Sequence, residues 1–329
     1  MDTTVFWIAV AFAEAATSGG VALINKRLLS TLDPIATAML VRAVSVVTIV
    51  VVTAPLTLLH MWSLTYEITW AAAGYVTLLA VFGWFIAQNA YYFALRSGPI
   101  SVVAPVSSTA LLFTALFATV FIGAALGAPT LAGLFITVAG VVAIARADRP
   151  HTVVVAEGPA PGTALDPAAA GPRPIGWTRS VPLAVALALV GAAGWGMAPV
   201  LIQLAVESVG HATVTMIVLA QSLGLLMTVS LAAVRRVPLT IRTLTAVELR
   251  RTRRLAVITG VLEGSCAVLF YLIIEHLGSV QAALIVATVP VFAIVWGVLF
   301  LRERPSRRLA LGIVVTLLGV FVATADRLW

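Results

Sequence analysis

Cysteine, histidine and charged side chains are scarce in this chain of 329 residues. Cys266 is the only cysteine, which excludes an intrachain disulfide. A thiolate-rich metal site is excluded as well, and the four histidines form no close cluster in the sequence that could replace one. Charged residues make up 10% of the chain, against about 25% in a soluble domain. We therefore expect neither a bound metal nor a water-exposed globular fold.

Sequence signatures of nucleotide-driven proteins and of metal-dependent enzymes are missing too. The chain has no Walker motif, so ATP is not expected to drive it directly. It has no His-Glu-x-x-His motif and no paired histidines at helical spacing. An intramembrane enzyme would need such a metal site or a nucleophile–base pair, so we expect no catalysis and no cofactor.

Apolar residues dominate the composition: 61% of the chain is hydrophobic and the mean hydropathy is +1.09. These values are typical of an all-α integral membrane protein, in which each span needs about 20 apolar residues. Met1–Thr4 lacks the basic region of a signal peptide, and the first apolar run continues to Ile24. We therefore expect this run to be a membrane span and not a cleaved leader.

One internal stretch, residues 147–179, differs from the rest because it is rich in Pro, Gly and Ala and shows no apolar periodicity. Such a segment cannot satisfy its backbone polar groups inside lipid, so it must lie in water or at the membrane surface. The sequence thus predicts a first membrane half at 1–146, a linker at 147–179, and a second half at 180–329.

Five apolar runs in each half predict ten transmembrane helices. Of the 20 basic residues, 18 follow odd-numbered helices, and the other two are Arg42 and Arg327. The positive-inside rule places these basic connections and the linker in the cytoplasm, with both termini outside a cell (inner or plasma) membrane. The same rule explains the net charge of +7 without a nucleic-acid partner. The predicted helices lie near 4–24, 34–54, 70–94, 100–122, 128–146, 180–204, 212–233, 254–274, 278–301 and 308–326.

An odd number of helices per half means that a repeat between the halves has inverted topology. Aligning Tyr92–Ala145 with Tyr271–Thr324, position by position and without gaps, gives nine identities. Three of the identical pairs are Gly133/Gly312, Thr137/Thr316 and Gly140/Gly319. Two inverted five-helix repeats place a substrate site near the midplane of the membrane, at the interface between the repeats.

Ionisable side chains inside the predicted helices are candidate site residues, because a charge at a helix centre costs about 2.5–3.5 kcal/mol on insertion scales. At a rise of about 1.5 Å per residue, Glu14, Arg42 and Glu263 all fall near the midplane. The first two predicted helices are joined by about nine residues and are expected to be antiparallel neighbours. Glu14 and Arg42 therefore either neutralise each other or line a polar cavity separately. Glu263 is either a site carboxylate or a neutral structural acid.

Five further residues complete the predicted site for substrate and protons. Trp195 and Gln221 fall at the same level, and Trp195 either lines the cavity or serves in packing. Gln88 and Asn89 lie nearer the cytoplasm, where they could instead form interhelical hydrogen bonds. Tyr92 follows them on the same predicted helix.

Two stretches of the second half resemble the drug/metabolite transporter superfamily, in its EamA-like ten-helix branch. They are AGWGMAPVLIQ at 193–203 and the stretch 276–320, which contains the helix–Arg-Glu-Arg–helix ending; 97–141 is the counterpart in the first half. Members often carry Gly-Glu at the end of the fourth helix of a half. Glu303 matches this acid, whereas Gly123-Ala124-Ala125 lacks it. The resemblance implies a transporter and leaves the substrate open.

The segment AFAEAATSGGVALINK at 11–26 is similar to the first helix of the small multidrug resistance proteins. In that family an intramembrane glutamate binds protons and cationic drugs in competition. Glu14 stands at the matching position, so the resemblance implies that Glu14 couples protons to the solute.

The function expected from the sequence is secondary transport of a small organic solute, a metabolite or drug, by alternating access and with proton-coupled export. An uncoupled or exchange-type metabolite carrier is the alternative, and an intramembrane enzyme or accessory membrane subunit is an alternative of another class. The expected partners are the solute, protons and the lipid bilayer, with the protein acting as a monomer or homodimer.

Overall fold

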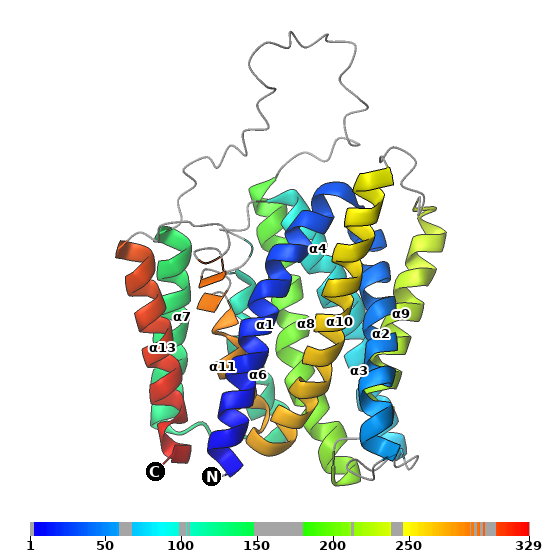
Figure 1. Ribbon diagram of the computed structural model, residues 1–329. Coiled ribbons are helices and arrows are strands. Elements are labelled where there is room, and N and C mark those ends of the chain that lie inside the picture. The colour runs from blue at the N-terminus through cyan, green and yellow to red at the C-terminus, as the bar shows by residue number, and fades with distance from the viewer. Residues whose placement is uncertain are drawn as a thin grey trace.

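The computed structural model describes residues 3–58, 68–98, 103, 106–147, 180–211, 214–237, 246–289, 291–292, 295–296, 299 and 307–328. Its elements are helices that run along one common axis and form an elongated bundle (Figure 1). Both termini lie at one end of the bundle (Figure 1). The first half contains α1 (Thr3–Thr31), α2 (Pro34–Leu58), α3 (Trp70–Leu79), η1 (Ala80–Ala87), α4 (Gln88–Ser97), α6 (Ala110–Phe117), η2 (Ala118–Ile122) and α7 (Ala128–Ala147). The second contains α8 (Val181–Val209), α9 (Val214–Val234), α10 (Ala246–Leu277), α11 (Ser279–Val286) and α13 (Arg307–Leu328).

Six of the described helices are long and apolar enough to cross a membrane: 4–29, 34–55, 70–97, 182–209, 214–234 and 247–277. Three shorter apolar helices, Val106–Ile122, Ala128–Gly140 and Leu311–Ala323, lie where three more spans are expected. The expected helix at 278–301 starts as α11, and much of its remainder lies outside the described residues. The predicted linker at 147–179 lies outside them too, except for Ala147, which is the last residue of α7. A multi-pass membrane protein follows from these spans, and the total of ten stays a prediction.

Several predicted helix bounds are wrong, because apolar runs underestimate helices that continue past the membrane core. The α1 helix ends at Thr31 instead of residue 24, so only Leu32 and Asp33 separate it from α2. The α10 helix begins at Ala246 instead of residue 254 and carries four exposed arginines in its first turns. The predicted end at residue 274 is also too early, because α10 continues to Leu277; the break lies at Gly278, which has a φ of 82° and precedes α11.

The outer surface of the bundle is apolar. Val51, Phe135 and Leu311 are each more than 60% exposed, and many other large aliphatic side chains point outward. A surface of this kind is unfavourable in water and favourable in lipid. By contrast, the exposed arginines that follow α9 and those of α10 and α13 lie at the bundle end opposite the termini (Figure 1). This distribution agrees with a membrane-embedded bundle that has one basic end.

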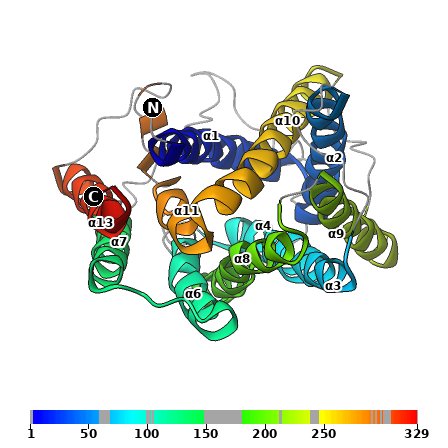
Figure 2. The same cartoon turned by 90° about the horizontal axis from the view of Figure 1, so that it is seen from below.

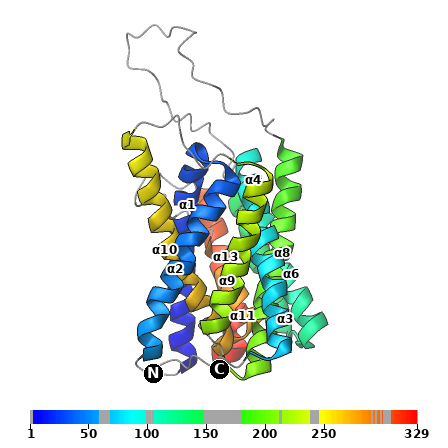
Figure 3. The ribbon, with the colours of Figure 1, turned by 90° about the vertical axis from the view of Figure 1, so that its right-hand side faces the viewer.

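The register of the sequence alignment between the halves extends along the whole chain. In this register, which pairs Tyr92 with Tyr271, the α1 helix is equivalent to residues 182–210, and α8 spans Val181–Val209. The α2 helix is equivalent to residues 213–237, and α9 spans Val214–Val234. The equivalent helices α2 and α9 lie side by side and run in opposite directions (Figures 1 and 3). An inverted repeat predicts this arrangement.

The equivalent helices α7 and α13 form a separate pair at the edge of the bundle (Figure 2). A Cβ atom on Gly140 would collide with Thr316, and a Cβ atom on Gly319 would collide with Thr137. Because Gly140 is equivalent to Gly319 and Thr137 to Thr316, the two helices exchange identical contacts. Small residues at such positions allow two membrane helices to approach closely.

The expected neighbours α1 and α2 are not packed against each other along their length. Instead, α10 from the second half lies between them and contacts both (Figure 2). The largest hydrophobic core accordingly mixes the halves, with Ile49 and Leu79 from the first and Ile202 and Tyr271 from the second. The interface between the repeats therefore runs through the middle of the bundle.

Candidate functional site

Polar side chains from both halves meet at the interface between the repeats. The α1, α2, η1, α4, α9 and α10 helices each contribute one residue. We call this group the central polar cluster, and it consists of Asn25, Arg42, Trp84, Tyr92, Gln221 and Glu263. Four of its members were predicted site residues.

Glu263 is the acceptor at the centre of the cluster. Its Oε1 atom accepts a hydrogen bond from Nδ2 of Asn25 at 3.0 Å and another from the hydroxyl of Tyr92 at 3.3 Å. Arg42 lies within electrostatic reach of the same carboxyl group. Two donors and a nearby guanidinium offset part of the cost of burying a carboxyl group. Glu263 is therefore held as a partnered acid.

Two glycines bring Glu263 close to Arg42. Gly260 and Gly264 form a Gly-x-x-x-Gly pattern on α10, and a Cβ atom at either position would meet the backbone of α2, at Val41 and Ser45 respectively. This close approach is the packing expected of small residues four apart in membrane helices. Glu263 directly precedes the second glycine, so it enters the interface next to α2.

Arg42 is 3% exposed and has two neutral partners. Its Nη1 atom lies 3.3 Å from Oε1 of Gln221, and its guanidinium carbon lies 5.3 Å from the centroid of the Trp84 ring. Gly224 leaves the space for this arrangement, since a Cβ atom there would come within 2.9 Å of Arg42 Nη1 and 2.7 Å of Trp84 Cβ. The cation–π contact and the amide stabilise the buried charge in part.

Arg42 and Gln221 are equivalent residues of the two repeats, because the alignment register pairs one with the other. A contact between equivalent residues lies on the axis that relates the repeats. Trp84 and Glu263 are a second equivalent pair in the same register, and both lie beside Arg42. The cluster therefore surrounds the pseudo-two-fold axis, where an inverted-repeat transporter is expected to hold its site.

Glu14 lies outside this cluster. Its Oε1 accepts a hydrogen bond of 2.8 Å from Ser18, and its Oε2 has no hydrogen-bond partner among the described residues. The side chain is 5% exposed, and the buried Cys266 lies within electrostatic reach. Asn25, which binds Glu263, is eleven residues further along α1, or about 16 Å. Glu14 is thus separated along α1 from the residue that contacts Glu263.

The predicted alternative of a Glu14–Arg42 pair is wrong in this structure. No ion pair joins Glu14 and Arg42 within the described part of the chain, and the acid beside Arg42 is Glu263. The cause is the position of α10, which separates α1 from α2 and brings its own carboxylate to Arg42. Depth in the membrane, estimated from one helix at a time, does not reveal which helices are neighbours.

The remaining predicted residues lie along α4 and α8. The Gln88 side chain is within hydrogen-bonding reach of Tyr92, one turn away on α4. Asn89 donates to the carbonyl of Phe85 at 2.7 Å, so it bonds to its own helix and not across to another. Trp195 packs against Tyr91 with ring centroids 4.7 Å apart, and its neighbours Gly194 and Gly196 make close contacts with η1 and α6. Trp195 therefore has a packing contact, and its role as a cavity wall remains a prediction.

Asn25 and Trp84 belong to the cluster but were not predicted. Asn25 was missed because the predicted first helix stops at residue 24, directly before it. Trp84 was missed, although extending the alignment register towards the N-terminus pairs it with Glu263. The π-helical turn η1 carries Trp84, whereas the equivalent stretch of α10 is regular α-helix. Such π turns are frequent at functional sites.

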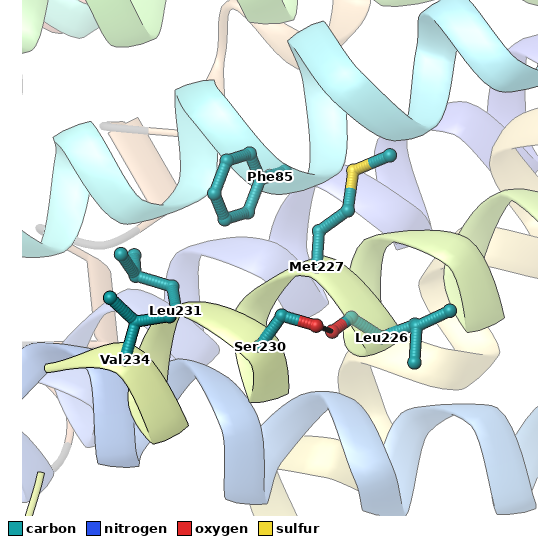
Figure 4. A pocket seen from close by; sticks show the side chains of 6 residues that line it. All are labelled: Phe85, Leu226, Met227, Ser230, Leu231 and Val234. Carbon is teal, nitrogen blue, oxygen red and sulfur yellow. Dashed lines mark hydrogen bonds between the residues drawn. The ribbon is translucent and has the colours of Figure 1, made fainter. Parts of the chain in front are cut away.

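An open hollow lies away from the cluster, between η1 and α9 (Figure 4). Its lining is almost wholly apolar, and Leu226 and Val234 are 61% and 80% exposed. The residues around it are Phe85, Leu226, Met227, Ser230, Leu231 and Val234. None of these is a predicted site residue, and we assign the hollow to the lipid-facing surface.

Comparisons with known proteins agree with this arrangement. A solved structure described as "Crystal structure of protein" has a TM-score of 0.62 and 17% sequence identity, and the match covers 98% of each chain. At this identity the likeness shows the fold alone. No curated protein matches the chain. The sequence profile of the EamA-like transporter family matches residues 5–146 and 182–325, which are the two repeats. The chain therefore belongs to the EamA-like transporter family.

Proposed function

We propose that the protein is a secondary transporter that moves a small organic solute by alternating access and exchanges it for protons. Membership of a transporter family and a polar cluster on the axis between inverted repeats support this function. We further propose that transport is export across the cell membrane, in line with the similarity of 11–26 to proton-coupled multidrug exporters. The basic end of the bundle would then face the cytoplasm, and both termini the outside.

Glu14 is the proposed proton carrier, and its unpartnered Oε2 is the observation that carries this proposal. A buried carboxylate without a counter-ion is unfavourable in apolar surroundings, so the carboxyl group gains by taking up a proton. Glu263 has two hydrogen-bond donors and Arg42 nearby, so it has less need of a proton. Exposure of Glu14 to water on one side of the membrane would release its proton there.

The test uses proteoliposomes that contain the purified protein and a metabolite extract in the lumen. With the outside made more acidic than the lumen, mass spectrometry of the outer solution should detect one or a few metabolites released by the wild type. Release should fall to the level of empty liposomes for Glu14→Gln and persist for Glu207→Gln, which alters an exposed glutamate at the end of α8.

The other outcomes separate the alternatives. Equal release with and without the pH gradient would replace proton coupling by an uncoupled or exchange-type carrier. Gradient-driven release by Glu14→Gln would remove Glu14 from the mechanism. Release of no metabolite under any gradient would favour an accessory subunit.

A further inference from the structure

The guanidinium group of Arg42 is buried without a direct counter-ion. No ion pair joins it to a carboxylate within the described residues, and its Nε–H group has no hydrogen-bond partner there. A cation in such surroundings is unfavourable unless it is paired, and a buried hydrogen-bond donor without an acceptor adds to the penalty. Arg42 therefore has unused capacity for one anionic acceptor.

The nearby acid does not fill this position. The Oε1 atom of Glu263 already accepts from Asn25 and Tyr92, which hold its carboxyl group on the side of α1 and α4. Glu263 acts on Arg42 through space, and no hydrogen bond joins the two side chains in the described part of the chain. A second anionic group could therefore bind Arg42 directly, although Glu263 would repel it.

A second unused donor lies beside Arg42. The indole Nε1–H of Trp84 is buried and has no hydrogen-bond partner among the described residues. Arg42 lies over the ring of this tryptophan, and Gly224 packs against both side chains. Two neighbouring side chains thus each have a buried donor without an acceptor, and one of the two is charged. A carboxylate, which only accepts hydrogen bonds and is negatively charged, is the kind of group that suits such donors.

We propose that Arg42 and Trp84 bind a carboxylate group of the transported solute, so that the substrate class is organic anions. This inference rests on the proposed transport function. Arg42 is the residue that contributes charge, and Gln221 is a positioning residue that orients it by the 3.3 Å contact.

The test measures binding of simple carboxylates to the full-length protein in detergent, by tryptophan fluorescence and melting temperature. Propanoate and benzoate are compared with propylammonium and benzylammonium at equal ionic strength, with chloride as the common reference. We expect a carboxylate to bind the wild type, and Arg42→Gln to weaken that binding about tenfold or more, because a charge-assisted hydrogen bond is lost.

Glu263→Gln should have the opposite effect on carboxylate binding, because it removes the charge that repels the carboxylate. This variant should bind the same carboxylate severalfold more tightly than the wild type does. Arg251→Gln, which alters an exposed arginine of α10, should leave the binding unchanged. If Arg42→Gln does not fold, the double variant Arg42→Gln/Glu263→Gln removes both of these neighbouring charges together, so that neither is left without the other, and it should lack the carboxylate response.

Failure of this inference can be distinguished from failure of transport. Binding of the ammonium probes without binding of the carboxylates would overturn it, as would carboxylate binding that survives in both Arg42 variants. Either result would leave gradient-driven release from proteoliposomes intact. If the wild type binds carboxylates but shows no gradient-driven release, the proposed transport function would be contradicted, whereas the carboxylate site at Arg42 and Trp84 would stand.

Discussion

Trp84 and Glu263 occupy equivalent positions in the two repeats, and both lie beside the guanidinium group of Arg42. The helices around the axis are thus related by the pseudo-two-fold symmetry, whereas the side chains at equivalent positions differ between the repeats. Under the alternating-access mechanism proposed above, the opposite-facing state would form when the two repeats exchange conformations. The hydrogen bond from Tyr92 to Glu263 would then be replaced by a contact between Tyr271 and Trp84. The two proposed states would therefore have different hydrogen bonds at the same place.

Tyr92 and Tyr271 are equivalent residues that should respond differently to loss of the hydroxyl. The Tyr92 hydroxyl donates to Glu263, whereas the buried Tyr271 hydroxyl has no hydrogen-bond partner among the described residues. Tyr92→Phe should lower the free energy of unfolding by about 1.5–3 kcal/mol, as for a hydrogen bond to a charged group. Tyr271→Phe should be neutral or stabilising. Thermal melting in detergent compares the two, and equal losses would contradict the structure.

The partner of Arg42 can be identified by two double-mutant cycles that share the variant Arg42→Gln. In the first cycle the second site is Glu263→Gln, and we expect a coupling of about 1 kcal/mol or more, because both charges are buried side by side. In the second cycle the second site is Glu14→Gln, and the effects on unfolding should add within about 0.5 kcal/mol. Strong coupling in the Glu14 cycle and additivity in the Glu263 cycle would instead support the Glu14–Arg42 pair, which was expected because both residues fall near the membrane midplane.

The contact between α7 and α13 should not tolerate a larger residue at Gly140. A Cβ atom there would collide with the side chain and backbone of Thr316, so Gly140→Ala should lower the free energy of unfolding by about 1–3 kcal/mol. Gly74→Ala is the matched control, because nothing lies within 4 Å of a Cβ atom at that helical position. Comparable melting temperatures for both variants would show that the helices are not in close contact.

The orientation in the membrane can be measured with single cysteines in a Cys266→Ser background. Glu207→Cys, at the bundle end that holds the termini, should react with an impermeant maleimide added to intact cells. Arg251→Cys, at the basic end, should react only after the cells are opened. The reverse pattern of labelling would invert the topology derived from the arginines.

The helical class, the transporter family and much of the polar cluster could be predicted from the sequence, because each depends on local features. Apolar runs indicate spans, and isolated charges inside them mark Arg42 and Glu263. The neighbours of these charges could not be predicted, because they depend on how α10 packs between α1 and α2. The alignment register contains part of this information, since it relates Arg42 to Gln221 and Trp84 to Glu263.

The reciprocal contact between α7 and α13 has a consequence for the origin of the chain. Two separate copies of one half-length protein could make the same contact if one copy were inserted upside down. In such an ancestor, every substitution would have appeared twice, once on each side of the axis. Fusion of two such copies into one gene would allow each side to change alone, which is a precondition for an arginine on one side and a glutamine on the other.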